Sequence, residues 1–372
     1  MKNLKKMLLF FQLYIMFSMT TYYFYSMQPE QPAEPKPPSR LNSSYSDTTQ
    51  PSVYHDNPKR RCEPAREITN NGFRVVQDLG EIIRLISERQ ELRKRRAGPR
   101  KLIQGMNFDC EEWMLEIRLN ELGNVVDHFI IVEGAYTLQN TKREQCFPRI
   151  MESNERISKW AHKIVYVYDD HPITGFLYWE AEVYYRDLIG LVGLQKLEAD
   201  ALAPDDLVII TDADEIPHPN FLHVLKTYEG FRTSINLHLI WTYYSYKWVN
   251  SASKTVNAIV SVGELSKAGN RTNQVRFNLL ANTKNSWSTG PNMIVGWHCS
   301  WCMPTANFID KMAHFAHSEL NQARFKDIEW LTSMRQDGLW FPDAAPNGCL
   351  QSQIQMPAYV EANIQRFKEI ST

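Results

Sequence analysis

Two carboxylates that follow a short apolar run are the residues best suited to chemistry in this chain. Asp212 and Asp214 stand one residue apart, directly after the run 207–211, which is bounded by Pro204 and Pro217. A short apolar run between turn residues predicts a buried strand. Oxygen ligands of this kind suit Mg²⁺ or Mn²⁺, and such a cation neutralises a diphosphate. The alternative is an ordinary acidic turn in solvent.

The elements that must position these carboxylates alternate between strands and helices. Sequence patterns predict strands over residues 101–105, 125–132, 163–168 and 207–211, and helices over 111–122 and 179–197. Such alternation is typical of α/β proteins with a mainly parallel sheet, whose ligands bind beyond the carboxyl ends of the strands. Glu133 ends the strand over 125–132, so we expect it to face the same crevice as the two aspartates. A solvated strand end is the alternative for Glu133.

The N-terminal segment predicts a membrane anchor. Residues 7–27 are uncharged and mostly apolar, which matches the roughly 20 residues that cross a bilayer. Lysines precede this segment, and Tyr22, Tyr23 and Tyr25 gather at its far end as in an aromatic belt. A cleaved signal peptide is the alternative, but its apolar core would be shorter and would end in small residues. We therefore expect residues 1–6 in the cytosol and the remaining chain in the secretory lumen.

Composition is compatible with a luminal protein. The triplets that begin at Asn42 and Asn270 are acceptor sequons for glycosylation. All six cysteines lie beyond the predicted anchor, and an even number permits disulfides. The formal net charge of −1 argues against nucleic acid as a partner.

The domain boundaries follow from changes in composition. The composition of residues 28–99 predicts a stalk. Its first part is rich in Pro, Ser and Thr, and its second part predicts a helix over 78–96 with a basic end. Residues 100–345 are long enough for one large α/β domain, and 346–372 form a C-terminal tail. The run from Arg93 to Arg96, followed by Ala97, matches sites cut by basic-site proteases, so a secreted form could arise near Arg96. A basic helix face is the alternative.

Several sequence blocks resemble one known family. They include residues 107–109 with Glu111, residues 115–122, residues 127–133, the long block 204–217 and the distinctive block 296–302, Gly-Trp-His-Cys-Ser-Trp-Cys. The later segments 311–312 and 317–321 are also similar. From about residue 101 to 343 the chain resembles glycosyltransferase family 17, the bisecting N-acetylglucosaminyltransferases.

The resemblance implies a fold, a reaction and a compartment. The expected fold is the GT-A-like nucleotide-sugar fold, with UDP-GlcNAc as donor and Mn²⁺, or Mg²⁺, as cofactor. The expected reaction is inverting β-1,4 transfer to the β-mannose of glycoprotein N-glycan cores, by a single-pass type II Golgi membrane protein. Asp212 and Glu133 are the expected donor-binding residues, and Asp212, Asp214 and His317 the expected metal ligands, with His298 as the competitor of His317.

Inverting transfer needs a general base on the far side of the donor sugar. A single displacement needs no enzyme nucleophile, so we expect a carboxylate from a late segment. Glu319 is the first candidate, Asp310 the second and Asp337 the third. Each has the alternative of an ordinary surface carboxylate.

Two further clusters have both structural and functional interpretations. Cys299 and Cys302 fit half of a zinc site, a redox motif or a structural disulfide, and an oxidising lumen favours a disulfide in which one or both pair elsewhere. Trp297 and Trp301 beside them could form the floor of a sugar site. The aromatic cluster 241–248 could bind a glycan, but packing in the core is the commoner role of such strands.

Other classes of function also fit parts of the sequence. A luminal transferase with a different donor or acceptor would need the same motifs. A lectin-like protein could bind sugar without turnover, although a pure binder would not need a pair of carboxylates that neutralises a diphosphate. A calcium module fits less well, because the acidic motif lacks a loop with many ligands.

Overall fold

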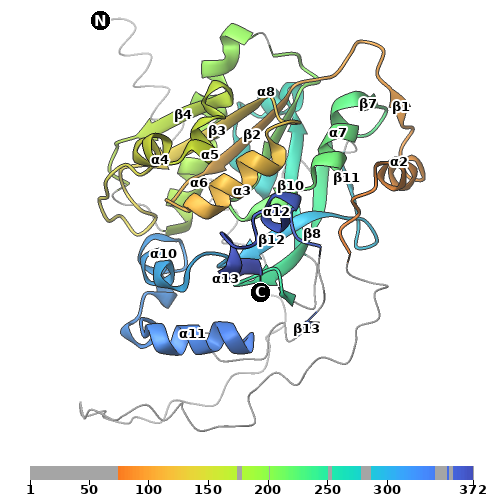
Figure 1. Cartoon of the computed structure of the whole chain (residues 1–372). Helices are drawn as coiled ribbons and strands as arrows, with labels where there is room; N and C mark the ends of the chain where they lie inside the picture. The colour runs from red at the N-terminus through yellow and green to blue at the C-terminus, as the bar shows by residue number, and fades with distance from the viewer. Residues whose placement is uncertain are drawn as a thin grey trace, which may run out of the picture. The chain divides into compact units, whose positions relative to one another are not determined.

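A mixed β-sheet forms the centre of the part of the chain that the structure describes. The computed structural model describes residues 74–173, 178–200, 202–249, 254–277, 286–339, 350–351 and 355–371. The main sheet has eleven strands in these ranges, ordered β13-β9-β8-β10-β5-β2-β3-β4, with β11 and β12 paired to β8 and β6 paired to β12. Figure 1 labels β2, β3 and β4 of this sheet. The predicted cytosolic tail, anchor and first part of the stalk lie outside the described residues. None of the helices within the described ranges is long and apolar enough to span a membrane.

The strands are β1 (Arg93–Lys94), β2 (Leu102–Asn107), β3 (His128–Gly134), β4 (Ile164–Asp169), β5 (Leu207–Ile210), β6 (Glu215–Pro217), β7 (Tyr228–Glu229), β8 (Ser234–Tyr243), β9 (Trp248–Val249), β10 (Lys254–Ser261), β11 (Ser286–Ser288), β12 (Ile294–Ser300) and β13 (Leu350–Gln351). The α-helices are α2 (Leu79–Ser87), α3 (Glu112–Leu122), α4 (Phe147–Ser153), α5 (Glu155–Ser158), α6 (Tyr178–Leu188), α7 (Pro219–Thr227), α8 (Val262–Lys267), α9 (Thr272–Arg276), α10 (Phe308–His314), α11 (Ile328–Asp337), α12 (Ala358–Ala362) and α13 (Lys368–Ser371).

The sheet is parallel on one side of β5 and largely antiparallel on the other. Strands β4, β3, β2 and β5 are parallel neighbours. Beyond β5, strands β10, β8, β9 and β13 pair antiparallel in turn. Parallel neighbours need long crossovers, whereas antiparallel neighbours need only short connections, and the chain from β8 to β10 has no room for a crossover helix. The predicted α/β class is therefore confirmed, but the sheet is mixed rather than mainly parallel.

The two faces of the parallel strands pack against different helices. Leu102, Ile131 and Ile209 belong to the apolar cluster that also contains Leu115 of α3 and Leu225 of α7. The residues that alternate with them on the strands pack with Tyr185 of α6 and with the π-helical turn Ile189–Gly193 that follows it. Side chains of a strand point alternately to its two faces, so each parallel strand contributes to both layers.

Two glycines allow α6 to lie close to the sheet. A Cβ atom added at Gly105 of β2 would overlap Ile189, and one at Gly134 of β3 would overlap the ring of Tyr185. Larger residues would push the helix away from the strands. The close contact fixes the position of α6, which carries Arg186.

The segment before residue 100 is part of the folded unit, which corrects the predicted stalk boundary. Helix α2 ends at Ser87 rather than near residue 96, and its Ile82 and Ile86 are fully buried. The basic run does not continue the helix, because Arg93 and Lys94 form β1, which pairs with β7. The apolar spacing of α2 therefore serves packing against the domain.

The C-terminal segment is also part of the folded unit rather than a free tail. Helix α12 lies against α3 (Figure 1), and the ring of Phe367 meets Trp113 edge to face at 5.6 Å between centroids. Buried Glu116 of α3 forms an ion pair with Arg366 at 2.6 Å. The backbone N–H groups of Ala358 and Tyr359 donate to Glu121. Charged residues of α3 that look solvent-facing in the sequence thus hold this segment in place.

Candidate active site

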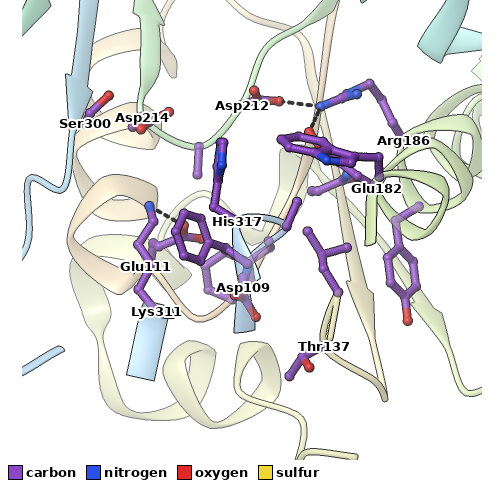
Figure 2. A pocket seen from close by; sticks show the side chains of 18 of the residues that line it. Asp109, Glu111, Thr137, Glu182, Arg186, Asp212, Asp214, Ser300, Lys311 and His317 are labelled. Carbon is purple, nitrogen blue, oxygen red and sulfur yellow. Dashed lines mark hydrogen bonds and ion pairs between the residues drawn. The ribbon is translucent and has the colours of Figure 1, made fainter. Parts of the chain in front are cut away.

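A cavity of about 980 Å³ opens at the carboxyl ends of the parallel strands. Asn107 at the end of β2 and Gly134 at the end of β3 line it. Asp212 and Asp214, from the turn after β5, also line it (Figure 2). The expectation that the acidic motif lies in a crevice beyond the strand ends agrees with this geometry.

A fully buried arginine binds the backbone of the acidic turn. The guanidinium of Arg118 on α3 donates to the carbonyl oxygens of Asp212, Ala213 and Glu215, the last at 2.8 Å. Burial lowers the pKa of Arg118 to about 10, against the opposing effect of the nearby carboxylates, so the group stays charged at neutral pH. These bonds occupy the carbonyls of the turn and leave its carboxylates directed to the cavity.

The carboxylate of Asp212 lies between two arginines. Its Oδ1 is 3.1 Å from Arg186 Nη2, and its Oδ2 is 2.9 Å from Arg276 Nη2 (Figure 2 shows the first contact). Burial alone would raise the pKa of Asp212, but the charges of Arg276 and Arg186 outweigh it and keep the pKa well below its usual range. Asp212 is therefore ionised, and 37% of its side chain remains exposed.

Asp214 has a different partner. Its Oδ2 is 3.5 Å from Nε2 of the buried His298, and its side chain is 17% exposed. Burial again opposes ionisation, while His298 and then Lys311 keep the pKa of Asp214 low. The backbone carbonyl of Asp214 accepts from Cys299 N at 2.9 Å, so the turn is also tied to the end of β12.

Cationic side chains surround the two aspartates. Arg276 forms two hydrogen bonds with the fully buried Glu215, at 2.9 and 3.0 Å, and Lys254 lies 3.7 Å from the same carboxylate. Lys311 lies on another wall, 3.3 Å from Glu111 (Figure 2). All three cations line the cavity with Arg186. A cavity with both carboxylates and several cations suits an anionic ligand that arrives with a divalent ion.

The donor set fits a divalent metal that is shared with a ligand. Asp212 and Asp214 are hard oxygen donors from one turn, and both reach the cavity. Within the described ranges, a group of three candidate ligands within 4.8 Å of one another occurs at Cys110, Glu133 and Cys146, and not around these aspartates. Mg²⁺ in nucleotide enzymes is bound by one or two carboxylates plus substrate phosphates, which is compatible with a pair. Cys110 and Cys146 are joined as a disulfide, so their group is no metal site.

Glu133 does not face the cavity, contrary to the expectation from the strand pattern. Its side chain is fully buried, and its carboxylate accepts from the backbone N–H groups of Cys146 and Phe147 and from the Tyr166 hydroxyl at 2.6 Å. Its neighbours Val132 and Gly134 line the cavity instead. Successive strand residues point to opposite faces, and Glu133 points to the face where it caps the start of α4.

The geometry distinguishes among the three candidates for the general base. Glu319 lines the cavity, whereas Asp310 and Asp337 are not among the lining residues. Among the described carboxylates of the cavity wall, Asp109, Glu111, Glu182 and Asp212 pair with arginine or lysine, whereas Asp214 and Glu319 pair with histidine. A carboxylate without a permanent cationic partner is more available to accept a proton.

His317 is the partner of Glu319. Its Nδ1 lies 2.6 Å from Glu319 Oε1, and its ring meets that of Trp179 edge to face at 4.9 Å. His317 lines the cavity (Figure 2), but it does not form a three-ligand group with Asp212 and Asp214 within the described residues. Its position favours a role beside Glu319 over the expected role as metal ligand. His298, the alternative candidate for the third metal ligand, already lies next to Asp214.

The cysteine pair and the aromatic cluster have mainly structural roles. Cys299 and Cys302 pair with each other as a disulfide, so a structural disulfide is confirmed and pairing elsewhere is wrong. Trp297 is buried outside the cavity, whereas Trp301 lines it. In the cluster 241–248, Tyr244, Tyr246 and Trp248 are core residues, and Trp241 and Tyr243 reach the cavity wall. Cys62 and Cys349 lie outside the described residues.

Sequence reasoning missed the cations that organise the site. Arg118 lies in the helix predicted over 111–122 and Arg186 in the helix predicted over 179–197, but neither was identified as a site residue. Arg276 follows no recognisable motif. The available signal for Arg186 was its spacing from Trp179 and Glu182, which places the three on one helix face.

Fold and site together define a class of protein: an α/β protein that presents paired carboxylates and several cations to one cavity at its strand ends. Comparisons with known proteins are consistent with this class. Residues 89–338 match the sequence model of glycosyltransferase family 17. The chain belongs to glycosyltransferase family 17, because this match covers more than half of its length.

Curated relatives carry one shared name. The beta-1,4-mannosyl-glycoprotein 4-beta-N-acetylglucosaminyltransferase of Rattus norvegicus is 28% identical over 298 residues, covering 73% of this chain and 54% of the relative. The protein of the same name from Homo sapiens is 28% identical over 297 residues, covering 72% and 54%. The chain thus spans about half the length of the curated relatives it matches.

Solved structures overlap with this chain only weakly. A mannosyltransferase from Pyrobaculum calidifontis in complex with GDP-Man and Mn²⁺ is 10% identical, with a TM-score of 0.34 over 63% of this chain and 68% of that one. A glucosyl-3-phosphoglycerate synthase from Mycobacterium tuberculosis is 11% identical, with a TM-score of 0.30 over 73% and 86%. Overlaps this weak carry no argument about the fold.

Proposed function

We propose that this glycosyltransferase moves N-acetylglucosamine from UDP-GlcNAc to a mannose of a glycoprotein N-glycan, in β-1,4 linkage and with inversion at the anomeric carbon. Family membership and the names of the curated relatives support the sugar and the acceptor. The observation that carries the proposal is the position of Asp212 and Asp214 in one cavity with Arg186, Arg276 and Lys311. The expected GT-A-like fold is part of this proposal.

Asp212 and Asp214 would hold Mn²⁺ or Mg²⁺, which when bound supplies positive charge to the leaving diphosphate. Arg276 and Arg186 already bind the Asp212 carboxylate. They lie where a diphosphate ligated through Asp212 would meet them, so they can exchange part of that contact for phosphate oxygens. Lys311 adds a further positive charge from the opposite wall. The negative charge that develops on the departing UDP is stabilised by this fixed set of cations.

Glu319 is the proposed general base. In an inverting displacement the acceptor hydroxyl attacks the anomeric carbon while the carboxylate takes the hydroxyl proton. Burial works to raise the pKa of Glu319, but its contact with His317 outweighs it and lowers the pKa, so the carboxylate is ionised at neutral pH. His317 holds that carboxylate in one orientation through the 2.6 Å contact.

A location in the Golgi membrane, with the catalytic unit in the lumen, belongs to the same proposal. The two disulfides of the described residues support it, because such bonds persist in oxidising compartments. The predicted anchor at residues 7–27 supports attachment to the membrane.

The direct test is sugar transfer by the full-length chain, made in a secretory host and purified in detergent. We expect incorporation of N-acetylglucosamine into a mannose-exposing N-glycan, dependent on UDP-GlcNAc and Mn²⁺. Transfer only from another nucleotide sugar, or only to another acceptor, would select the alternative of a related luminal transferase. Glycan binding without any transfer or donor hydrolysis would select a lectin-like protein.

A further inference from the structure

One face of α6 lines the cavity with a row of three residues. Trp179, Glu182 and Arg186 follow each other at intervals of three and four residues, so they lie in one row on the helix. All three line the cavity. The helix rises about 1.5 Å per residue, so Trp179 and Arg186 are separated by about 10 Å along its axis.

At one end of this row, Arg186 contacts the acidic turn. Arg186 pairs with Asp212 at 3.1 Å and also with Glu182 on its own helix (Figure 2). A donor whose diphosphate is bound through Asp212 therefore has its phosphates at this end. The donor sugar, which is bonded to the diphosphate, extends from there into the cavity.

At the other end of the row, Trp179 contacts the histidine that pairs with the candidate base. The indole of Trp179 meets the ring of His317 edge to face, with 4.9 Å between centroids and an angle of 88° between planes. His317 in turn contacts Glu319. Trp179 is therefore fixed beside the group that must touch the acceptor hydroxyl.

Trp179 also presents an unusually open surface for its size. Its exposed fraction is 52%, although it lines a cavity. An isolated exposed apolar residue needs no explanation, but an exposed indole in a cavity wall offers a flat apolar face to a ligand. One face of a pyranose ring is formed mainly by C–H groups, and it packs well against such a surface.

We propose that Trp179 is the platform on which the acceptor sugar stacks, next to the His317–Glu319 pair. The inference rests on the proposed function and adds to it the residue that binds the acceptor. Helix α6 then sets the distance between the diphosphate at Arg186 and the acceptor sugar at Trp179, with the donor sugar between them.

The test compares two substitutions in the full-length chain. Trp179→Leu keeps an apolar side chain without the flat face, and Trp179→Phe keeps a smaller flat face. With saturating UDP-GlcNAc and a mannose-exposing N-glycan as acceptor, we expect Trp179→Leu to raise the acceptor KM about tenfold or more. Trp179→Phe should raise it less than about threefold. The dissociation constant of UDP, measured by calorimetry, should stay within about twofold of wild type for both.

Ile328→Ala is the matched control, because Ile328 is 40% exposed and does not line the cavity. Its acceptor KM should equal that of wild type. An unchanged acceptor KM in Trp179→Leu, or a UDP dissociation constant that rises as much as the acceptor KM, contradicts the proposal. If the wild-type chain transfers no sugar, the proposed function fails instead, so the two failures are distinct.

A second measurement does not depend on the folding of Trp179→Leu. The wild-type chain is labelled with 5-fluorotryptophan, and the ¹⁹F resonance of Trp179 is identified by its loss in Trp179→Phe. We expect this resonance to shift when the acceptor glycan is added and to stay in place when UDP is added alone. If the resonance does not shift at saturating acceptor, Trp179 is not the residue on which the acceptor sugar stacks.

Discussion

Arg118 lies beneath the acidic turn and donates a hydrogen bond to the carbonyl oxygen of Asp212. The same guanidinium also reaches the carbonyls of Ala213 and Glu215 and the hydroxyl of Thr211. No part of Arg118 is exposed. The conformation that presents Asp212 and Asp214 to the cavity therefore depends on a residue that touches no ligand.

Replacing Arg118 should disturb both stability and activity. Arg118→Met removes the hydrogen bonds that the guanidinium donates to the carbonyls of Ala213 and Glu215, each worth about 1–3 kcal/mol, so we expect a loss of roughly 3 kcal/mol in the free energy of unfolding. Transfer should fall at least about 100-fold, because the turn loses its fixed shape. Chemical denaturation and transfer assays measure the two effects. Arg84→Met, at an arginine side chain that is 59% exposed on α2, is the control and should change neither.

Asp212→Asn and Asp214→Asn should each abolish transfer while the protein remains folded. Each substitution keeps the shape of the side chain but removes a negative charge that a divalent cation needs. Calorimetric titration with Mn²⁺ in the presence of UDP should show binding at least about tenfold weaker. Asp337→Asn, outside the cavity, should bind and transfer like wild type. Near-normal Mn²⁺ binding by a folded Asp214→Asn variant would remove this residue from the metal site.

Glu319→Gln should lower kcat by about 100-fold or more, which is the usual contribution of a general base. The KM for the donor should change little, since Glu319 pairs with His317 and not with the acidic turn or its arginines. Asp310→Asn is the matched comparison, because Asp310 is exposed and does not line the cavity. An active Glu319→Gln variant together with an inactive Asp310→Asn variant would show that Asp310, and not Glu319, is the general base.

His218 should make the domain less stable in mild acid. This buried residue precedes α7, and its Nδ1 accepts from Asn220 N, which requires the neutral ring. Burial lowers its pKa from 6.5 to about 4. The unfolded chain therefore binds more protons between these values, and stability falls as pH drops from about 6.5 to about 4, by at most about 3 kcal/mol from this group.

His218→Asn isolates that contribution, because asparagine accepts the same capping hydrogen bond without titrating. Urea denaturation at several pH values should give a flatter dependence for His218→Asn than for wild type. Parallel curves for the two proteins would show that His218 does not titrate in this range.

Proteolysis at the basic run should be slow in the native protein. Arg93 and Lys94 are paired with β7, and Arg95, at 9% side-chain exposure, forms an ion pair with Asp205. Proteases need an accessible and locally unfolded backbone, so we expect a basic-site protease to leave Arg96 uncut. N-terminal sequencing of any secreted fragment tests this prediction. A fragment that begins at Ala97, and is lost in Arg96→Ala, would show that β1 opens readily and that a secreted form can arise there.

The sequence predicted the elements of the parallel half of the sheet and the place of the acidic turn. Short apolar runs such as the one at 207–210 are constrained by burial on both faces, and their turn residues mark their ends. The helix over 179–197 was predicted too long, because it changes to a π-helical turn after Leu188. The antiparallel half depends on contacts between distant segments, which local patterns do not encode.

The main errors concern charged residues that are buried. Glu133 was placed in the cavity because it ends a strand, but its partners Cys146 and Tyr166 are distant in sequence. Glu116 and Glu121 of the helix predicted over 111–122 bind the C-terminal segment, a role that the sequence analysis does not predict. Burial of a charge requires a specific partner, and a single sequence does not reveal which one.

Transfer of N-acetylglucosamine from UDP-GlcNAc, followed with and without Mn²⁺ and for Asp212→Asn, tests the central claim most directly. The predicted result is a β-1,4-linked N-acetylglucosamine on a mannose of the N-glycan acceptor, formed by the wild-type chain only with the metal and absent with Asp212→Asn. Product analysis by NMR establishes the linkage and the anomeric configuration. Equal transfer by the folded Asp212→Asn variant, or an α-linked product, would contradict the account.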